Sequence, residues 1–237
     1  MARYRTRNQT NGHNPRRYLA RRLEILRAAG RTFRELGFAE TGMRDIAQAA
    51  ALSSANLYNY FQGKYEILFF CQDSSLDRLN GALDRARRMR TSATEKLSYV
   101  ILSHLRCVLD EVDGSAAHLL TNALPPRLQR SLVTKRDRYE EGVRQLIEMG
   151  SRSGEFIPCD STLTACAILG AMNWSVRWYS PDGRLTAAEI AEGFGDYLIR
   201  GLLVKPTALS RTRVVRKLRY SRAERLVRGA KKNISAR

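Results

Sequence analysis

Apolar residues recur every three or four positions along most of the chain, which is the spacing of one face of an α-helix. Alternation of apolar and polar residues, which would indicate strands, is nowhere sustained. Glycine, proline and polar breaks divide the pattern into successive elements. It predicts helices over residues 18–36, 43–50, 54–59, 64–89, 94–112, 115–122, 127–151, 161–179 and 186–204. We therefore expect an all-α protein.

The two short helices within residues 41–68 have the build of a helix-turn-helix. Asp45 falls in the first turn of the first helix, where the helix dipole favours an acid. Ser53 is suited to capping the second helix, which carries small and polar residues on one side and Leu57 and Tyr60 on the other. A slim polar face of this kind suits entry into the DNA major groove. The apolar face of the first helix consists of Met43, Ile46, Ala47 and Ala50.

This stretch resembles the TetR family of transcription regulators. Ala51 departs from the family pattern, which usually has a turn glycine here, and glycine eases a positive backbone angle. The resemblance implies an N-terminal three-helix helix-turn-helix domain that binds DNA and a C-terminal helical bundle that binds a ligand and dimerises. The residues that match the family pattern are Thr41, Asp45, Ile46, Ala47, Leu52, Ser53, Leu57, Tyr58, Tyr60, Phe61 and Lys64.

The same motif predicts which side chains contact DNA. The amine of Lys64 and the hydroxyls of Tyr58 and Thr41 are expected to reach phosphates, while the second short helix enters the groove. The full predicted DNA-binding set is Thr41, Arg44, Ser53, Ser54, Ala55, Asn56, Tyr58, Asn59, Tyr60 and Lys64.

The net positive charge is confined to the two ends of the chain. Residues 1–22 hold seven arginines and no acid, and residues 205–237 hold twelve Lys or Arg and one acid. Such segments attract phosphate backbones without reading sequence. We expect a flexible basic arm over 1–17, a DNA-binding domain over 18–63, a ligand-binding and dimerisation domain over 64–204, and a basic tail over 205–237. The tail is expected to be disordered, although a basic amphipathic helix on DNA or on an anionic membrane is an alternative.

The last two predicted helices, about 161–179 and 186–204, are apolar on most faces. A helix of this kind has to bury two sides, and a second copy of the chain is the simplest cover for the outer one. The resulting homodimer would place two recognition helices about 34 Å apart on one side of the DNA. No apolar run is long enough to span a membrane. The four cysteines are scattered, as in a reduced, cytoplasmic protein.

Residues 135–140 and 172–183 are similar to a TetR subgroup that controls fatty-acid or steroid breakdown and responds to acyl-CoA thioesters. That similarity implies an effector whose binding moves the helix over 64–89 and the DNA-binding domain attached to it. Arginines would bind its phosphates, and two tryptophans one turn apart would flank its acyl chain or stack on adenine. The alternative is that the tryptophans fill the core or the dimer interface. The predicted ligand-binding residues are Arg136, Arg138, Trp174, Arg177 and Trp178.

The combined prediction is a dimeric transcriptional repressor that a small hydrophobic effector, such as an acyl-CoA, releases from a palindromic operator. A TetR-type regulator of another lipophilic ligand or drug, an activator, and a sequence-tolerant architectural DNA-binding protein are the alternatives. An enzyme acting on CoA thioesters is disfavoured because no catalytic constellation can be assigned. Three dispersed histidines do not form a metal site. We expect no catalytic residue, no metal and no cofactor.

Overall fold

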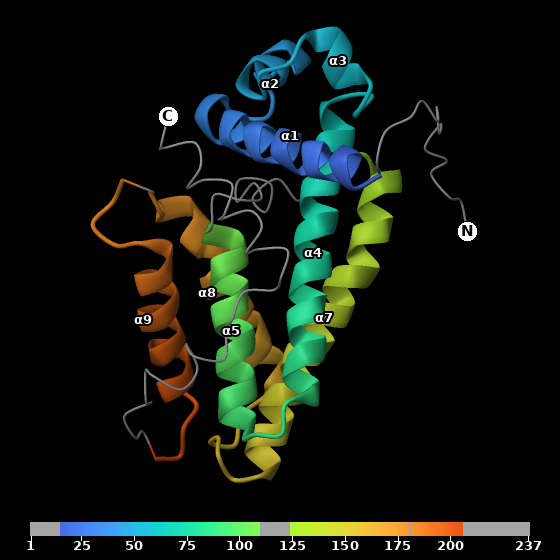
Figure 1. The fold of residues 1–237 in the computed structure, drawn as a ribbon. Helices are drawn as coiled ribbons and strands as arrows, with labels where there is room; N and C mark the ends of the chain where they lie inside the picture. The colour runs from blue at the N-terminus through green and yellow to red at the C-terminus, as the bar shows by residue number, and fades with distance from the viewer. Residues whose placement is uncertain (1–14, 110–123, 181, 206–237) are drawn as a thin grey trace. The chain divides into compact units, whose positions relative to one another are not determined.

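The computed structural model describes residues 15–109, 124–180 and 182–205. The predicted helix at 115–122, most of the N-terminal arm and the tail beyond residue 205 lie outside these ranges. The described residues are helical, and the expected all-α fold is confirmed (Figure 1). The helices are α1 (Pro15–Leu36), α2 (Met43–Ala49), α3 (Ser54–Tyr58), α4 (Lys64–Arg88), α5 (Ala93–Leu109), α7 (Pro126–Arg152), α8 (Ser161–Trp178) and α9 (Ala187–Arg200).

The helices begin and end where local chemistry favours it. Pro15 and Pro126 begin α1 and α7, one to three residues before the predicted starts, because the first turn of a helix does not use the N–H that proline lacks. Gly37 follows α1 with φ 82°, as expected for a helix stop. Thr186 caps α9 through a hydrogen bond from the backbone N–H of Glu189.

The chain divides into two compact units whose segments alternate along the sequence. Unit 1 contains residues up to 78 together with 107–137 and 173–182, and unit 2 contains residues 79–106, 138–172 and those from 183 onward. Helices α4, α5, α7 and α8 therefore each contribute to both units. The predicted domain boundary between residues 63 and 64 stays a prediction.

Unit 1 is built on one hydrophobic core shared by α1, α2, α3, the first half of α4 and the beginning of α7. Figure 1 shows α1, α2 and α3 grouped around the N-terminal end of α4. Burying these side chains removes apolar surface from water, which is the main favourable contribution to folding. The core consists of Ile25, Leu26, Ala29, Phe33, Ile46, Ala47, Leu57, Phe61, Ile67, Leu68, Cys71, Leu76, Leu124 and Leu132.

Unit 2 is tied together across its loops. Glu155 accepts hydrogen bonds from the backbone N–H groups of Ala93 and Thr94, which begin α5. Phe156 forms an isolated antiparallel bridge with Leu203. Helix α9 ends at Arg200 and not at residue 204 as predicted, and Leu203 pairs with Phe156 instead of continuing the helix. None of the described helices combines the length and apolar character that crossing a membrane requires.

Candidate DNA-binding interface

Helix α2 is fixed at its start and packed on its inner face. The carboxylate of Asp45 accepts a 2.8 Å hydrogen bond from the backbone N–H of Gly42. This bond satisfies an N–H near the helix start that has no partner within the helix, and the acid also complements the helix dipole. Ile46 and Ala47 are buried, so the helix is held against α1 and α3 by its predicted apolar side. Arg44 is exposed on the outer side.

The turn that follows α2 has the unusual geometry that its sequence suggested. Ala51 has φ 52°, in the left-handed region where side chains are disfavoured. The N–H of Leu52 bonds the carbonyl of Ala47 at 2.8 Å and closes the turn. Arg21 of α1 donates a 3.1 Å hydrogen bond to the carbonyl of Ala50. The turn is therefore held both from within and by α1, a contact that the local sequence did not predict.

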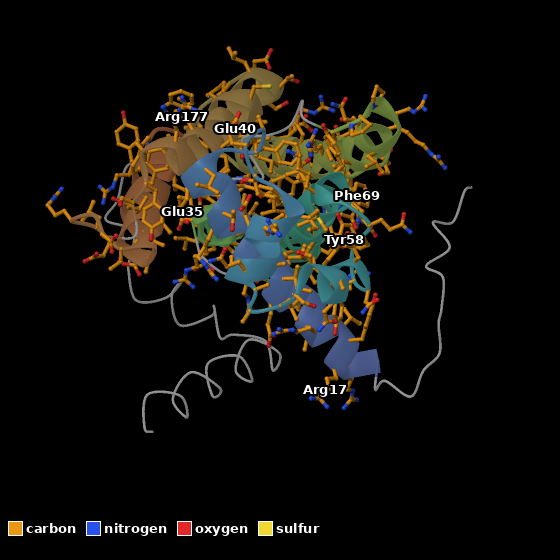
Figure 2. All side chains as sticks on the ribbon, turned by 90° about the horizontal axis from the view of Figure 1, so that it is seen from above. Arg17, Glu35, Glu40, Tyr58, Phe69 and Arg177 are labelled. Carbon is orange, nitrogen blue, oxygen red and sulfur yellow. The ribbon has the colours of Figure 1, made fainter. Side chains whose placement is uncertain are left out.

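Helix α3 presents a row of small and polar side chains to solvent. Ser53 caps it, since its hydroxyl accepts a 3.2 Å hydrogen bond from the N–H of Asn56. Leu57 is completely buried and anchors the five-residue helix to the core. Figure 2 looks onto this part of unit 1 and labels Tyr58, the last residue of α3, and Arg17 in the first turn of α1. The exposed predicted residues are Arg44, Ser53, Ser54, Ala55, Asn56, Tyr58 and Asn59.

Three of the predicted DNA-binding residues lie deeper. Thr41 is 1% exposed, and its hydroxyl donates to the carbonyl of Gly37 at 2.6 Å. Tyr60 is half-buried and stacks on Tyr18, with ring centres 5.2 Å apart. The ammonium of Lys64 donates to the carbonyls of residues 38, 39 and 41 at 2.9, 2.9 and 3.0 Å. The structure therefore leaves seven of the ten predicted residues exposed, on α2 and on α3 with its flanking residues. It directs the Thr41 hydroxyl and the Lys64 ammonium toward the protein.

A second set of contacts surrounds the beginning of α4, and sequence reasoning did not identify it. The guanidinium of Arg22 lies 3.8 and 4.5 Å from the ring centres of Phe70 and Phe61 and 3.9 Å from the carboxylate of Glu66. Burial lowers the pKa of Arg22. The only sequence signal for this cluster is an arginine on the inner side of an otherwise apolar helix stripe.

Unit 1 also carries an open hollow of about 470 Å³ beside the start of α1. None of the predicted effector-binding residues lines it. Its wall combines two guanidinium groups with the stacked tyrosine pair, and one of the two, Arg21, is paired with Glu24. The lining residues are Arg17, Tyr18, Ala20, Arg21, Glu24 and Tyr60.

Two of the predicted effector-binding residues, Arg136 and Arg138, are hydrogen-bonded to side chains of α4. Arg136 is half-buried and donates to the amide oxygen of Gln72 at 2.9 Å. Burial lowers its pKa, and the charge of Asp137 partly opposes that shift. Arg138 forms two 2.9 Å hydrogen bonds with the carboxylate of Asp84.

The other three predicted effector residues lie on the outer side of α8. Trp174 and Trp178 are 63% and 50% exposed, and Arg177 is exposed as well. Leu163, which is 71% exposed, precedes Trp174 by eleven residues and Trp178 by fifteen, so the three share one helical face. Tyr197 of α9 is 75% exposed. We call the exposed apolar residues of the α8 face, Leu163, Ala167, Gly170, Trp174 and Trp178, the α8 stripe.

Sequence and structure comparisons point to one family. The profile of the bacterial regulatory proteins of the tetR family matches residues 25–69, and the profile of the tetracyclin repressor-like C-terminal domain matches residues 90–202. The chain is 32% identical to the TetR family transcriptional regulator PfmR from Thermus thermophilus. The alignment covers 75% of this chain and 97% of PfmR, with a TM-score of 0.67.

Two further relatives are informative. The HTH-type transcriptional repressor KstR2 of Rhodococcus jostii is 29% identical over 193 residues, which cover 77% of this chain and 91% of KstR2. A structure of AibR in complex with isovaleryl coenzyme A and operator DNA is 25% identical, with a TM-score of 0.64 and coverage of 76% of this chain and 98% of AibR. These relatives are regulators and not enzymes. The chain belongs to the TetR family of bacterial transcriptional regulators, and it is a DNA-binding regulatory protein.

Proposed function

We propose that this regulator is a dimeric repressor that a small hydrophobic effector, such as an acyl-CoA thioester, releases from a palindromic operator. The observation that carries the proposal is the exposed face of α2 and α3. Its outward residues are small or polar, while Ile46, Ala47 and Leu57 hold the same two helices in the core.

The side chains on this face suit contacts with both the base edges and the phosphates of a DNA duplex. Asn56 and Asn59 carry amides that can bind base edges, and Ser54 and Ala55 are slim enough to admit close approach to the groove. Arg44 and the hydroxyl of Tyr58 are placed to contact phosphates, which fix the register of a bound helix. Contacts of Thr41, Tyr60 and Lys64 with DNA stay predictions, because the Thr41 hydroxyl and the Lys64 ammonium face the protein and Tyr60 is half-buried.

Dimerisation is supported by the α8 stripe and by Tyr197 on α9. Large exposed apolar side chains at helical spacing mark surfaces that a partner covers. A second copy is the fitting partner because an isologous interface uses the same surface on both subunits. Two copies would also present two recognition helices to the two halves of a palindrome. Under this proposal, Trp174 and Trp178 belong to the interface, which is the alternative weighed for them from the sequence.

The effector is inferred from the relatives and from Arg136. AibR was solved with isovaleryl coenzyme A, and the alignment, which covers 98% of AibR and 76% of this chain, makes a related thioester the leading candidate here. The guanidinium of Arg136 is half-buried and donates to the neutral amide of Gln72. Such a guanidinium could bind an anionic group. One guanidinium nitrogen of Arg138 already donates to both carboxylate oxygens of Asp84, and a phosphate would have to compete with that carboxylate.

The test begins with DNA selected by the protein from a random double-stranded library. Fluorescence anisotropy then measures binding to the selected fragment and to a scrambled fragment at physiological salt. A panel of acyl-CoA thioesters including isovaleryl-CoA, the matching free acids, and CoA alone is added to the complex. Release by one thioester, with no effect of CoA alone, is expected. A coupling of about 1–3 kcal/mol, equivalent to roughly 5- to 150-fold in affinity, would suffice.

Other results would redirect the assignment. Selective DNA binding that ignores every thioester would favour a TetR-type regulator of another lipophilic ligand. Equal binding to the selected and scrambled fragments, with a steep salt dependence on both, would favour the architectural alternative.

A further inference from the structure

The ammonium of Lys64, the first residue of α4, is surrounded by backbone carbonyls. It donates to Phe38 and Ala39 at 2.9 Å and to Thr41 at 3.0 Å. A lysine ammonium has three protons, so the three carbonyls use its whole donor capacity. All three belong to the connection between α1 and α2, more than twenty residues earlier in the chain.

Aromatic rings hold this connection in place. The ammonium lies 4.9 Å from the ring centre of Phe38, a distance at which the ring attracts a cation. The Phe38 ring also contacts Phe33 of α1 and Tyr65 of α4, at 5.1 and 5.3 Å between centres. The lysine is thus seated among groups from α1, α4 and the segment that leads into α2.

The other side of the same helical turn is tied down independently. The carboxylate of Glu66 accepts a 2.6 Å hydrogen bond from the N–H of Gln62 and lies 3.9 Å from the guanidinium of Arg22. Arg22 in turn packs on Phe61 and Phe70. The first turn of α4 therefore holds the α1–α2 connection on one side, and α1 and the α3–α4 turn on the other.

We propose that Lys64 is a positioning residue. It ties the start of α4 to the α1–α2 connection and thereby fixes the positions of α2 and α3 relative to the DNA. Turning its ammonium to a phosphate would break three charge-assisted hydrogen bonds and leave three carbonyls without this donor. The lysine therefore acts on DNA through the placement of α2. The proposal rests on the proposed function, because DNA affinity is the property that Lys64 controls.

A positioning residue and a phosphate ligand differ in their salt dependence. Each phosphate contact made by a cation contributes about 0.9 to the slope of log K against log salt, whereas a misplaced helix loses affinity at every salt concentration. Lys64→Met removes the charge and all three donors. Lys64→Gln removes the charge but keeps an amide that can donate to two carbonyls. Arg44→Met is the comparison, since it removes a charge from an exposed position that the proposed function places at the DNA.

The experiment measures anisotropy of each full-length variant on the selected fragment and on random-sequence DNA, from low to moderate salt, beside a thermal melt by circular dichroism. For Lys64→Met we expect affinity for the selected fragment to fall by roughly tenfold, about the effect of losing one good base contact. The salt slope should match that of the wild type. For Lys64→Gln we expect recovery to within roughly threefold of the wild type, because much of the hydrogen bonding returns.

Two results would overturn the proposal. A slope lower by about 0.9 in both Lys64 variants would make the lysine a phosphate ligand. A lower melting temperature with unchanged affinity of the folded protein would make it a purely structural residue. Failure of the proposed function is distinguishable, because it would appear in the wild type as equal affinity for selected and random DNA. The slope comparison on random DNA would still decide the role of Lys64.

Discussion

A guanidinium nitrogen of Arg21 donates a hydrogen bond of 3.1 Å to the carbonyl of Ala50, the C-cap residue that follows α2. The next residue, Ala51, has φ 52°. The turn of the helix-turn-helix thus combines an unfavourable backbone angle with an external hydrogen bond from α1. Strain of this kind persists only where the surrounding structure fixes the conformation.

Replacing Ala51 with glycine should stabilise the protein. An L-residue in the left-handed region costs about 1–2 kcal/mol, and glycine relieves that strain. The greater conformational freedom of glycine in the unfolded chain offsets about 0.4–1 kcal/mol of the stabilisation. We expect the free energy of unfolding to rise by about 0.5–1 kcal/mol, measured by urea denaturation. Ala49→Gly, two residues earlier at the end of α2, is the control and should destabilise by about 0.5–1 kcal/mol. Equal effects of the two changes would contradict the strain at Ala51.

Gly150 of α7 lies where no side chain fits. A Cβ added there would come within 2.1 Å of the Phe156 ring, and Phe156 is only 1% exposed. Gly150→Ala should therefore destabilise by about 1–3 kcal/mol through overpacking. Gly81 in α4 is the matched control, since its added Cβ would meet only the flexible end of Arg85 at 3.6 Å. Gly81→Ala should gain about 0.5–1 kcal/mol of stability from helix propensity. Thermal melts of the two variants and the wild type measure this difference.

Glu155 makes stability depend on pH in the acid range. Burial raises the pKa of this carboxyl, but hydrogen bonds from Thr94, Ala93 and Ser153 outweigh it, so the pKa is lowered from 4.5. A lowered pKa means that the folded state binds fewer protons than the unfolded state. The stabilisation is therefore complete above about pH 4.5 and is lost as pH falls through the folded pKa.

Glu155→Gln should remove one of the two acceptors at the start of α5 and destabilise by about 1 kcal/mol at neutral pH, as for loss of a helix cap. The difference from the wild type should shrink in urea melts as the pH falls below about 4.5. Glu35→Gln on the exposed side of α1 is the control and should change little at either pH. A pH-independent difference at Glu155 would show that its charge is not involved.

Local chemistry in the sequence predicted much of this fold. Ser53 and Thr186 cap helices because their hydroxyls reach N–H groups three residues away, and such contacts depend only on neighbouring residues. Gly37 ends α1 for an equally local reason. The apolar spacing in the helix-turn-helix placed Ile46 and Leu57 in the core, where both are completely buried.

Contacts between residues distant in sequence were not predictable in this way. The sequence motif suggested that Lys64 faces DNA, whereas its ammonium donates to the carbonyls of Phe38, Ala39 and Thr41, more than twenty residues earlier in the chain. The bridge from Phe156 to Leu203, which lies just beyond the end of α9, joins residues far apart along the chain and carries no strand pattern. Such pairings follow from how helices pack, and hydrophobic periodicity reports only which side of each helix is buried.

The α8 stripe makes dimerisation testable at a single residue. Leu163 is 71% exposed on α8, and an aspartate there would put an unpaired charge into the proposed interface. We expect Leu163→Asp to shift the protein from dimer to monomer in sedimentation velocity, and to weaken operator binding because each monomer contacts only one half-site.

Leu19 of α1 provides the matched control for that prediction. It is also a leucine on an exposed helix face, at 62%, but it lies outside α8 and α9. Leu19→Asp should leave the dimer intact, so a difference between the two variants locates the interface and excludes a general effect of added negative charge. Monomerisation by Leu19→Asp, or a stable dimer of Leu163→Asp, would place the interface elsewhere. In that case Trp174 and Trp178 would again be available as effector ligands, because nothing would then require their exposed faces to be covered by a second copy.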